Sequence, residues 1–150
     1  MTCDINKQFV DTNILVYCYD ASSKNKHIKA KELLIDLWEK NSGCLSIQVM
    51  QEFYVIVTQK VPVPLNKEKV IQILEDFSQW SYHIPDAVDV IEAINIQERN
   101  KISFWDAMII NSAKASGCGI IWSEDLSHDQ SYEGVKVLNP FIDFTDFILE

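Results

Sequence analysis

The sequence predicts an α/β protein in which helices cover both faces of a central parallel β-sheet. Two observations support this prediction. Short apolar stretches alternate along the chain with longer segments whose apolar residues recur at helical spacing. The short stretches are mostly apolar throughout, instead of on alternate residues, which is typical of parallel strands buried on both faces.

The first predicted strand covers residues 7–11, and residues 11–13 form a polar triplet between apolar runs. A polar break follows at residues 20–23. A helix is predicted over residues 24–40, and residues 41–43 end it. The apolar residues that give this helix its spacing are Ile28, Leu33, Leu34 and Leu37.

The middle of the chain predicts two helices and two short strands. Ser46 can cap the first turn of one helix, and Asn66 can cap the other. The linker Val61-Pro62-Val63-Pro64 separates them, because proline is not tolerated inside a helix. In order, the elements are a strand over residues 44–47, a helix to about residue 59, a helix over residues 67–80 and a strand over residues 81–84.

The C-terminal third continues the alternation of helices and strands. Pro85 suits the first turn of a helix over residues 86–100. Ser103 can cap a further helix, which Gly117 ends. The last two strands are predicted over residues 119–122 and 135–138.

The composition limits the class of protein. Residues 1–150, of which 47% are hydrophobic, suit one domain with a proper core. No apolar run has the length of a membrane span, and the N-terminus lacks a signal-peptide pattern, so we expect a cytoplasmic protein without membrane contact. The four cysteines lie far apart, which disfavours a zinc or redox motif. The net charge of -9 is poor for nucleic-acid binding, unless divalent cations among clustered acids supply positive charge locally.

Four acidic residues do not fit an ordinary surface. Asp11 lies between apolar runs, and a buried carboxylate needs hydrogen-bond donors, a cation or a raised pKa. Glu52 would share a helix face with apolar residues. Asp106 lies three residues after Ser103, and Asp125 closely follows a buried strand. Each has a plain alternative explanation: turn or capping residues for the aspartates, and for Glu52 the edge of an apolar stripe.

These acids are nevertheless expected to meet at one edge of the sheet. In open α/β sheets, ligands bind beyond the carboxyl ends of the strands. Asp11 and Asp125 both follow such ends, Asp106 opens the helix that leads into the second strand, and Glu52 can reach them from its own helix. If these acids were only turn or capping residues, their meeting at one edge would require four separate coincidences.

The motifs that carry these acids resemble those of the PIN-domain nucleases, especially the VapC-type toxins of bacterial toxin–antitoxin pairs. The resemblance spans nearly the whole chain, and it implies a PIN-like three-layer sandwich and a metal-dependent endoribonuclease. The matching segments are Val10-Asp11-Thr12-Asn13, Gln51-Glu52-Phe53-Tyr54, Phe104-Trp105-Asp106-Ala107, Trp122-Ser123-Glu124-Asp125-Leu126, Gly134-Val135 and Asn139-Pro140-Phe141.

The resemblance also implies roles for individual residues. The catalytic residues would be Asp11, Glu52, Asp106 and Asp125. Of these, Asp11, Asp106 and Asp125 would bind the metal, and Glu52 would hold a water or act as general base. Clustered carboxylates without a His or Cys cage suit Mg²⁺ or Mn²⁺. The supporting residues would be Asn13, Ser123 and, as a further candidate, Asp129.

The RNA substrate would need basic contacts, for which the chain offers few residues. The densest basic stretch covers residues 24–31, although a charge run is usually a solvated helix face. The candidates for RNA binding are Lys24, Lys26, Lys29, Arg99 and Lys101.

Two protein partners are expected from the resemblance, a cognate antitoxin and a second copy of the chain. An acidic site also attracts an arginine-bearing peptide. The helices around Leu33, Leu37, Val55 and Ile56 could supply a groove for an amphipathic partner helix, unless these residues fill the core.

Two other functional classes stay open. A PIN-like fold that no longer cuts RNA would be an interaction module, but it would tolerate the loss of acids that are all present here. An α/β phosphatase with an aspartate nucleophile would want a second aspartate two residues after Asp11, where the chain has Asn13. Metal-dependent RNA cleavage by the purified protein separates the three.

Overall fold

The computed structural model describes residues 4–142, which contain a six-stranded sheet in the order β3-β2-β1-β4-β6-β5. All neighbouring strands are parallel except β5 and β6. The predicted α/β class with a mostly parallel sheet is confirmed. The strands are β1 (Asp4–Val10), β2 (Gly43–Ser46), β3 (Ser81–His83), β4 (Cys118–Trp122), β5 (Ser131–Tyr132) and β6 (Val135–Leu138).

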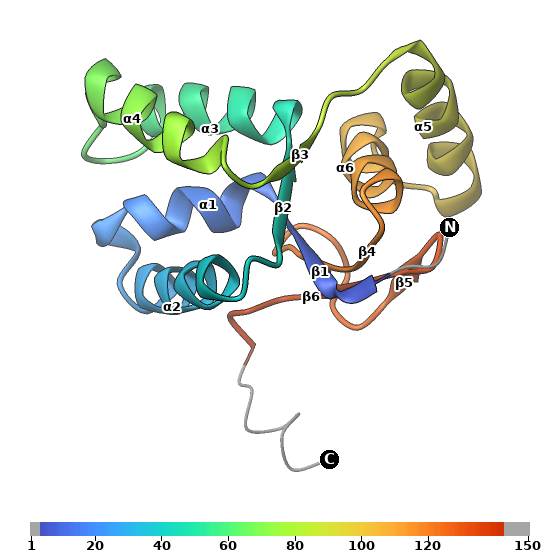
Figure 1. The fold of residues 1–150 in the computed structure, drawn as a ribbon, viewed down its shortest axis with the longest axis horizontal. Helices are drawn as coiled ribbons and strands as arrows, with labels where there is room; N and C mark the ends of the chain where they lie inside the picture. Colours follow the sequence, from blue (N-terminus) through green and yellow to red (C-terminus); the bar gives the residue numbers. More distant parts are fainter. Residues whose placement is uncertain (1–3, 143–150) are drawn as a thin grey trace.

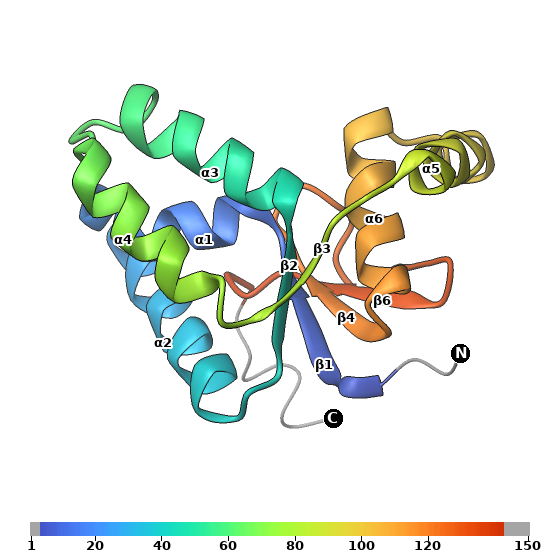
Figure 2. The same ribbon diagram turned by 45° about the horizontal axis from the view of Figure 1, so that its top comes forward.

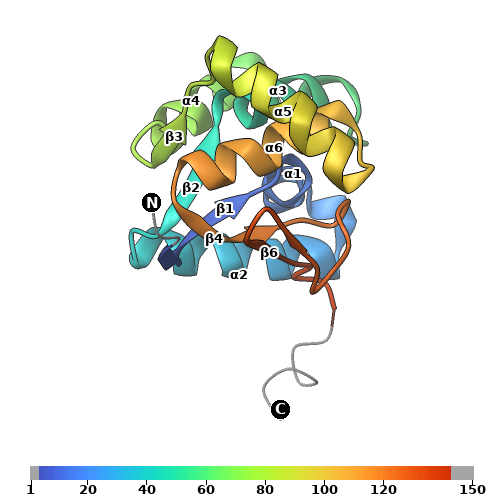
Figure 3. The same ribbon diagram turned by 90° about the vertical axis from the view of Figure 1, so that its right-hand side faces the viewer.

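Helices cover both faces of this sheet, so the molecule has three layers. Helices α1 to α4 lie on one side and α5 and α6 on the other (Figures 1 and 2). Viewed from the second side, α6 crosses in front of the sheet and α2 lies behind it (Figure 3). The helices are α1 (Thr12–Tyr19), α2 (Asn25–Glu39), α3 (Ile47–Gln59), α4 (Lys67–Phe77), α5 (Ala87–Asn100) and α6 (Phe104–Ala115), with a 3₁₀ turn at Ala21–Ser23.

The core is continuous through the sheet. Phe9 of β1 and Ile121 of β4 are fully buried at its centre, with Leu37 and Phe53 on one side and Ile110 on the other. Burying each such side chain contributes roughly 1.5–3 kcal/mol to folding. These contacts hold β1 and β4 side by side, and their carboxyl ends carry the acidic motifs.

The predicted helix caps are confirmed. The Ser46, Asn66 and Ser103 side chains each accept a hydrogen bond from the backbone N–H three residues later, at the starts of α3, α4 and α6. Within residues 4–142, none of the helices has the length and hydropathy of a membrane span.

Several boundaries differ from the sequence prediction. The first strand ends at Val10, and Asp11 caps α1 instead. Helix α1 itself was not predicted, because its apolar sequence shows no polar face that would reveal a helical period. Pro85 precedes the capping residue Asp86 instead of entering the helix. Helix α4 ends at Phe77, and the following turn brings Trp80 into the core. The two-residue strand β5 is too short to give a periodic signal.

Candidate active site

Asp11 lies where β1 ends, next to the end of β4. Its backbone N–H donates to the carbonyl of Trp122 (3.0 Å), and its carboxylate accepts from the Thr12 N–H (2.7 Å) and the Ser123 hydroxyl (2.9 Å). Only 6% of the residue is exposed. Burial raises the pKa of Asp11 to about 7, although the hydrogen bonds from Ser123 and Thr12 oppose the rise. The carboxyl group therefore changes charge near neutral pH.

Ser123 connects the ends of the two central strands. Its hydroxyl donates to Asp11 and accepts from the backbone N–H groups of Asp125 (3.2 Å) and Leu126 (3.3 Å). The register that pairs Val10 with Trp122 brings the two following residues opposite each other. Because a hydroxyl offers one donor and two acceptor sites, Ser123 is fully used in holding Asp11 and the next loop together.

Asp125 enters the same site from the loop after β4. The side-chain amide of Asn13 donates to its carboxylate (2.8 Å). Burial raises the pKa of Asp125, and the charges of Asp106 and Glu124 raise it further. Asn13 thus joins the start of α1 to this loop.

Glu52 and Asp106 complete the group of acids. Glu52 is half-buried on α3, where the amide of Gln48 donates to it (2.8 Å). Burial raises the pKa of Glu52, and the charges of Asp106 and Asp125 add to the rise. Asp106 lies in the first turn of α6, where the helix dipole favours a negative charge. The structure therefore brings Asp11, Glu52, Asp106 and Asp125 into one electrostatic cluster, which we call the acid cluster.

The acid cluster has the chemistry of a site for a hard cation, although it is not a closed cage. Residues 4–142 contain no group of three or more His, Cys, Asp or Glu side chains placed to hold a metal ion together. Mg²⁺ binds through one or two carboxylates and keeps several waters, so it does not need such a cage. Burial is the main cause of the raised pKa values of Asp11, Glu52 and Asp125, and the repulsion that adds to it would become attraction to a cation at their centre. The donor set therefore fits Mg²⁺ or Mn²⁺.

The structure does not link every predicted site residue to the acid cluster. Asp129 forms an ion pair with Lys136 (2.8 Å), and this partner lowers the pKa of Asp129. Arg99 pairs with Glu92 (3.1 Å) and Glu133 (2.5 Å). Among the contacts described for residues 4–142, none joins the last three basic candidates to the acids; they are Lys24, Lys29 and Lys101.

Lys26 is the basic candidate that reaches the edge of the site. Its ammonium group pairs with Glu124, which also accepts from the hydroxyl of Tyr17 (2.7 Å). The same ammonium lies over the rings of Tyr17 (5.1 Å) and Phe141 (5.4 Å). This network ties the loop that carries Asp125 to α1 and α2. Sequence reasoning missed Glu124, and its position beside Asp125 was the only local signal for it.

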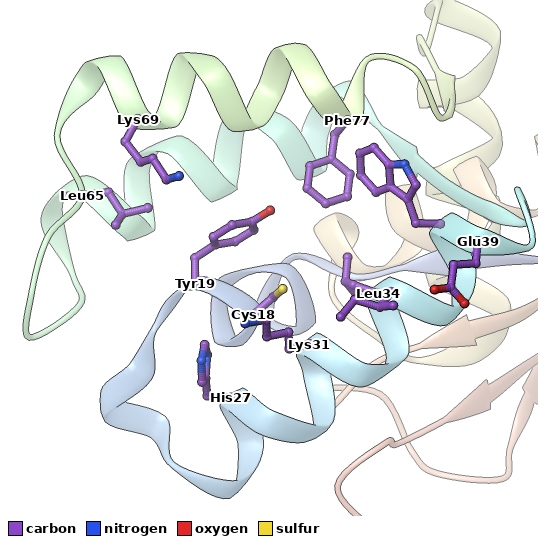
Figure 4. A pocket seen from close by; sticks show the side chains of 11 residues that line it. Cys18, Tyr19, His27, Lys31, Leu34, Glu39, Leu65, Lys69 and Phe77 are labelled. Atoms are coloured by element: carbon purple, nitrogen blue, oxygen red, sulfur yellow. The ribbon is translucent and has the colours of Figure 1, made fainter.

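A separate apolar groove lies away from the acid cluster, between α2 and α4 (Figure 4). It has a volume of about 590 Å³, and Figure 4 shows Tyr19 and Phe77 near its centre. The predicted groove is found in part: the helix that carries Leu33 and Leu37 supplies one wall, although Leu37 itself is fully buried in the core. Val55 and Ile56 line a different hollow. The residues that line the observed groove include Leu34, Ile35, Trp38 and Leu65, with Lys31 and Lys69 among them.

Comparisons with known proteins bear on the family and the fold of the chain. A family model described as PIN domain matches residues 9–133. The solved structures with a similar fold include a toxin–antitoxin complex from Klebsiella pneumoniae (16% identity, 90% of this chain and 98% of that chain, TM-score 0.67). They also include a DNA-bound VapBC from Salmonella typhimurium (20% identity, 89% of this chain and 98% of that chain, TM-score 0.61). A third is the sarcin-ricin loop cleaving toxin VapC20 from Mycobacterium tuberculosis (16% identity, 79% of this chain and 90% of that chain, TM-score 0.61). No curated protein matches the chain in sequence.

Proposed function

Because the chain belongs to the PIN domain family, we propose that it is a metal-dependent endoribonuclease and the toxin of a toxin–antitoxin pair. In this proposal the chain is a single PIN domain that acts in the cytoplasm as a homodimer. The observation that carries the proposal is the acid cluster, whose members act on one another at the carboxyl ends of β1 and β4.

Each acid has a proposed task in cleavage. Asp11 and Asp106 bind Mg²⁺ or Mn²⁺ directly, and Asp125 completes the ligand set. When bound, the cation neutralises the scissile phosphate and the leaving oxygen and lowers the pKa of a water. Glu52 positions or deprotonates the attacking water, and a raised pKa suits a general base. As the family implies, cleavage leaves a 5′-phosphate and a 3′-hydroxyl.

Asn13 and Ser123 support the reaction through the groups they hold. Ser123 keeps Asp11 beside the loop that follows β4, and Asn13 fixes the carboxylate of Asp125. Both are therefore positioning residues in this proposal. Since Asp129 is paired with Lys136 outside the cluster, the proposed site no longer includes it.

Cleavage of RNA by the purified protein tests the proposed activity. We expect Asp11→Asn and Asp106→Asn to lose cleavage by at least about a hundredfold while keeping the fold, because each removes one metal-binding charge. Asp129→Asn is the matched control and should cleave RNA normally. Undiminished cleavage by both cluster variants in excess EDTA would contradict the mechanism. Phosphatase activity without RNA cleavage would favour the α/β phosphatase. The absence of both activities would favour the interaction module.

We further propose that the apolar groove between α2 and α4 receives an amphipathic helix of the antitoxin (Figure 4). Its volume of about 590 Å³ accommodates several apolar side chains. Lys31 and Lys69 lie among its lining residues and complement acidic residues on the polar face of such a helix. An arginine of the same partner can pair with the acid cluster and block RNA.

Co-expression with the protein encoded immediately upstream tests the partner. We expect that protein to co-purify and to suppress ribonuclease activity and growth arrest. Ile35→Asp should abolish co-purification, because Ile35 lines the groove and is 48% exposed. Val88→Asp on α5, at a residue that is 71% exposed, is the control and should leave co-purification unchanged. If the upstream protein neither binds nor inhibits, the toxin assignment fails, and a free-standing PIN nuclease would still satisfy the cleavage test.

A further inference from the structure

A second hollow adjoins the acid cluster on the side of Glu52. It has a volume of about 340 Å³ and lies between the first turns of α3 and α6. Its lining residues are Gln48, Gln51, Glu52 and Trp105. Because Glu52 belongs both to this hollow and to the acid cluster, a molecule in the hollow lies next to the proposed site of cleavage.

Trp105 presents its indole ring to solvent at this hollow. The residue is 64% exposed, although it directly precedes Asp106. The ring of Phe104 packs edge-on against the indole, with centroids 5.1 Å apart. The backbone carbonyl of Trp105 accepts a hydrogen bond from the Gln48 amide (3.3 Å). The indole is therefore a supported, accessible aromatic surface that contributes little to the core.

Gln48 lines the hollow and carries an acceptor without a partner among the described residues. The residue is 7% exposed, and its Nε2 donates to Glu52 (2.8 Å) and to the carbonyl of Trp105 (3.3 Å). Both partners are acceptors, so the orientation of the amide is determined. Its Oε1 is buried and has no hydrogen-bond partner within the described part of the chain. A buried acceptor of this kind is costly unless a donor reaches it.

We propose that Trp105 and Gln48 form a subsite for one unpaired base of the RNA substrate, next to the scissile phosphate. The base stacks on the indole, as bases stack on aromatic residues in proteins that bind single strands. Gln48 Oε1 accepts a hydrogen bond from an N–H on the Watson–Crick edge of that base. All four RNA bases carry such a donor, but it is engaged in a duplex. The subsite therefore selects an unpaired nucleotide and tolerates different bases.

This proposal rests on the proposed ribonuclease function and narrows its substrate to RNA that is single-stranded at the cut. Stacking also explains how a protein with a net charge of -9 can bind RNA, because a base contact adds affinity without adding lysine or arginine. The other explanation for an exposed indole is that a partner protein covers it, and the experiment below separates the two.

Binding of labelled RNA to the Asp11→Asn protein in Mg²⁺ tests the subsite, since this variant is expected to keep the hollow but not to cut. The probes are a short oligoadenylate, the same strand in a duplex, and a series with one abasic nucleotide at successive positions. Trp105→Ala should weaken binding of the single strand by at least about fivefold. Trp105→Phe should retain most of the affinity, and Gln48→Leu should lose part of it. Tyr54→Ala, which removes an exposed ring elsewhere on α3, is the matched control and should bind normally.

The abasic series makes the test specific for stacking. At one position the abasic substitution should weaken RNA binding by the parent protein, which carries Asp11→Asn alone. It should not weaken RNA binding by the protein that also carries Trp105→Ala, because the two changes remove the same contact. Equal affinity of Trp105→Ala and the parent would overturn the subsite and leave the ribonuclease proposal intact. Loss of antitoxin binding by Trp105→Ala without loss of RNA binding would also overturn it. If the wild type neither binds nor cuts any RNA, the subsite and the proposed function fail together.

Discussion

At the residue scale, Asp11 is held by two opposing effects. Its burial between β1 and α1 disfavours the charged carboxylate, while the donors Thr12 and Ser123 favour it. Burial is the larger effect, so the group takes up a proton more readily in the folded chain than in the unfolded one. Binding a cation would reverse this preference, because the cation stabilises the charged form.

The pH dependence of stability follows from this shift. Between the ordinary pKa of 3.8 and about 7, the folded protein binds more protons at Asp11 than the unfolded chain does. The free energy of unfolding of the metal-free protein should therefore fall as the pH rises through this range. Asp11→Asn removes the effect, so it should melt at least about 3 °C above the wild type at pH 8. Between about pH 5 and pH 8 its free energy of unfolding should fall less than that of the wild type.

Thermal melts of both proteins in EDTA at several pH values measure this difference. The raised pKa values of Glu52 and Asp125 act in the same direction in both proteins, so the comparison isolates Asp11. Parallel stability curves for the two proteins would show that Asp11 titrates normally in the folded state.

At the element scale, the close approach of β2 to the turn after α4 depends on one glycine. A Cβ atom at Gly43 would lie 2.4 Å from the ring of Trp80. That ring packs against Phe77 (4.9 Å) and Trp38 (5.5 Å), so it has little room to move. Gly43 therefore lets the indole lie directly on the strand that leads into α3 and Glu52.

Gly43→Ala should destabilise the protein by about 1–3 kcal/mol, because the added methyl group overpacks the contact with Trp80. Urea unfolding measures the change. The double variant with Trp80→Leu should lose less than the sum of the two single changes, since the smaller side chain makes room for the methyl group. Strict additivity would show that the cost of Gly43→Ala comes from somewhere other than this contact.

At the scale of the whole molecule, the acid cluster concentrates negative charge in a protein with a net charge of -9. Charges of one sign repel one another in the folded state when no cation is present. An ion that binds only the folded protein stabilises it by mass action, by about 2.7 kcal/mol at a hundred times its dissociation constant.

Mg²⁺ should therefore raise the melting temperature of the wild type and raise that of Asp11→Asn less. Melts over a series of Mg²⁺ concentrations at constant ionic strength measure both shifts. Asp129→Asn is a control with the same change in net charge, and it should respond as the wild type does. Identical shifts in the wild type and Asp11→Asn would mean that Mg²⁺ binds elsewhere.

The sequence alone determined the features that depend on near neighbours in the chain. The caps at Ser46, Asn66 and Ser103 were predictable, because a cap bonds to the backbone three residues on. The apolar strands predicted the parallel sheet, and the rule for strand ends placed Asp11 and Asp125 on the same edge.

Only the tertiary structure decided which distant side chains meet. Asp129 had a plausible position beside the last motif, but the return of β6 gives it Lys136 as its partner. Arg99 is likewise taken up by Glu133 from the turn between β5 and β6. The hollow of Gln48 and Trp105 forms because α3 and α6 begin side by side, 57 positions apart in the chain. Local patterns record burial and helical or strand period, whereas these pairings depend on how the whole chain packs.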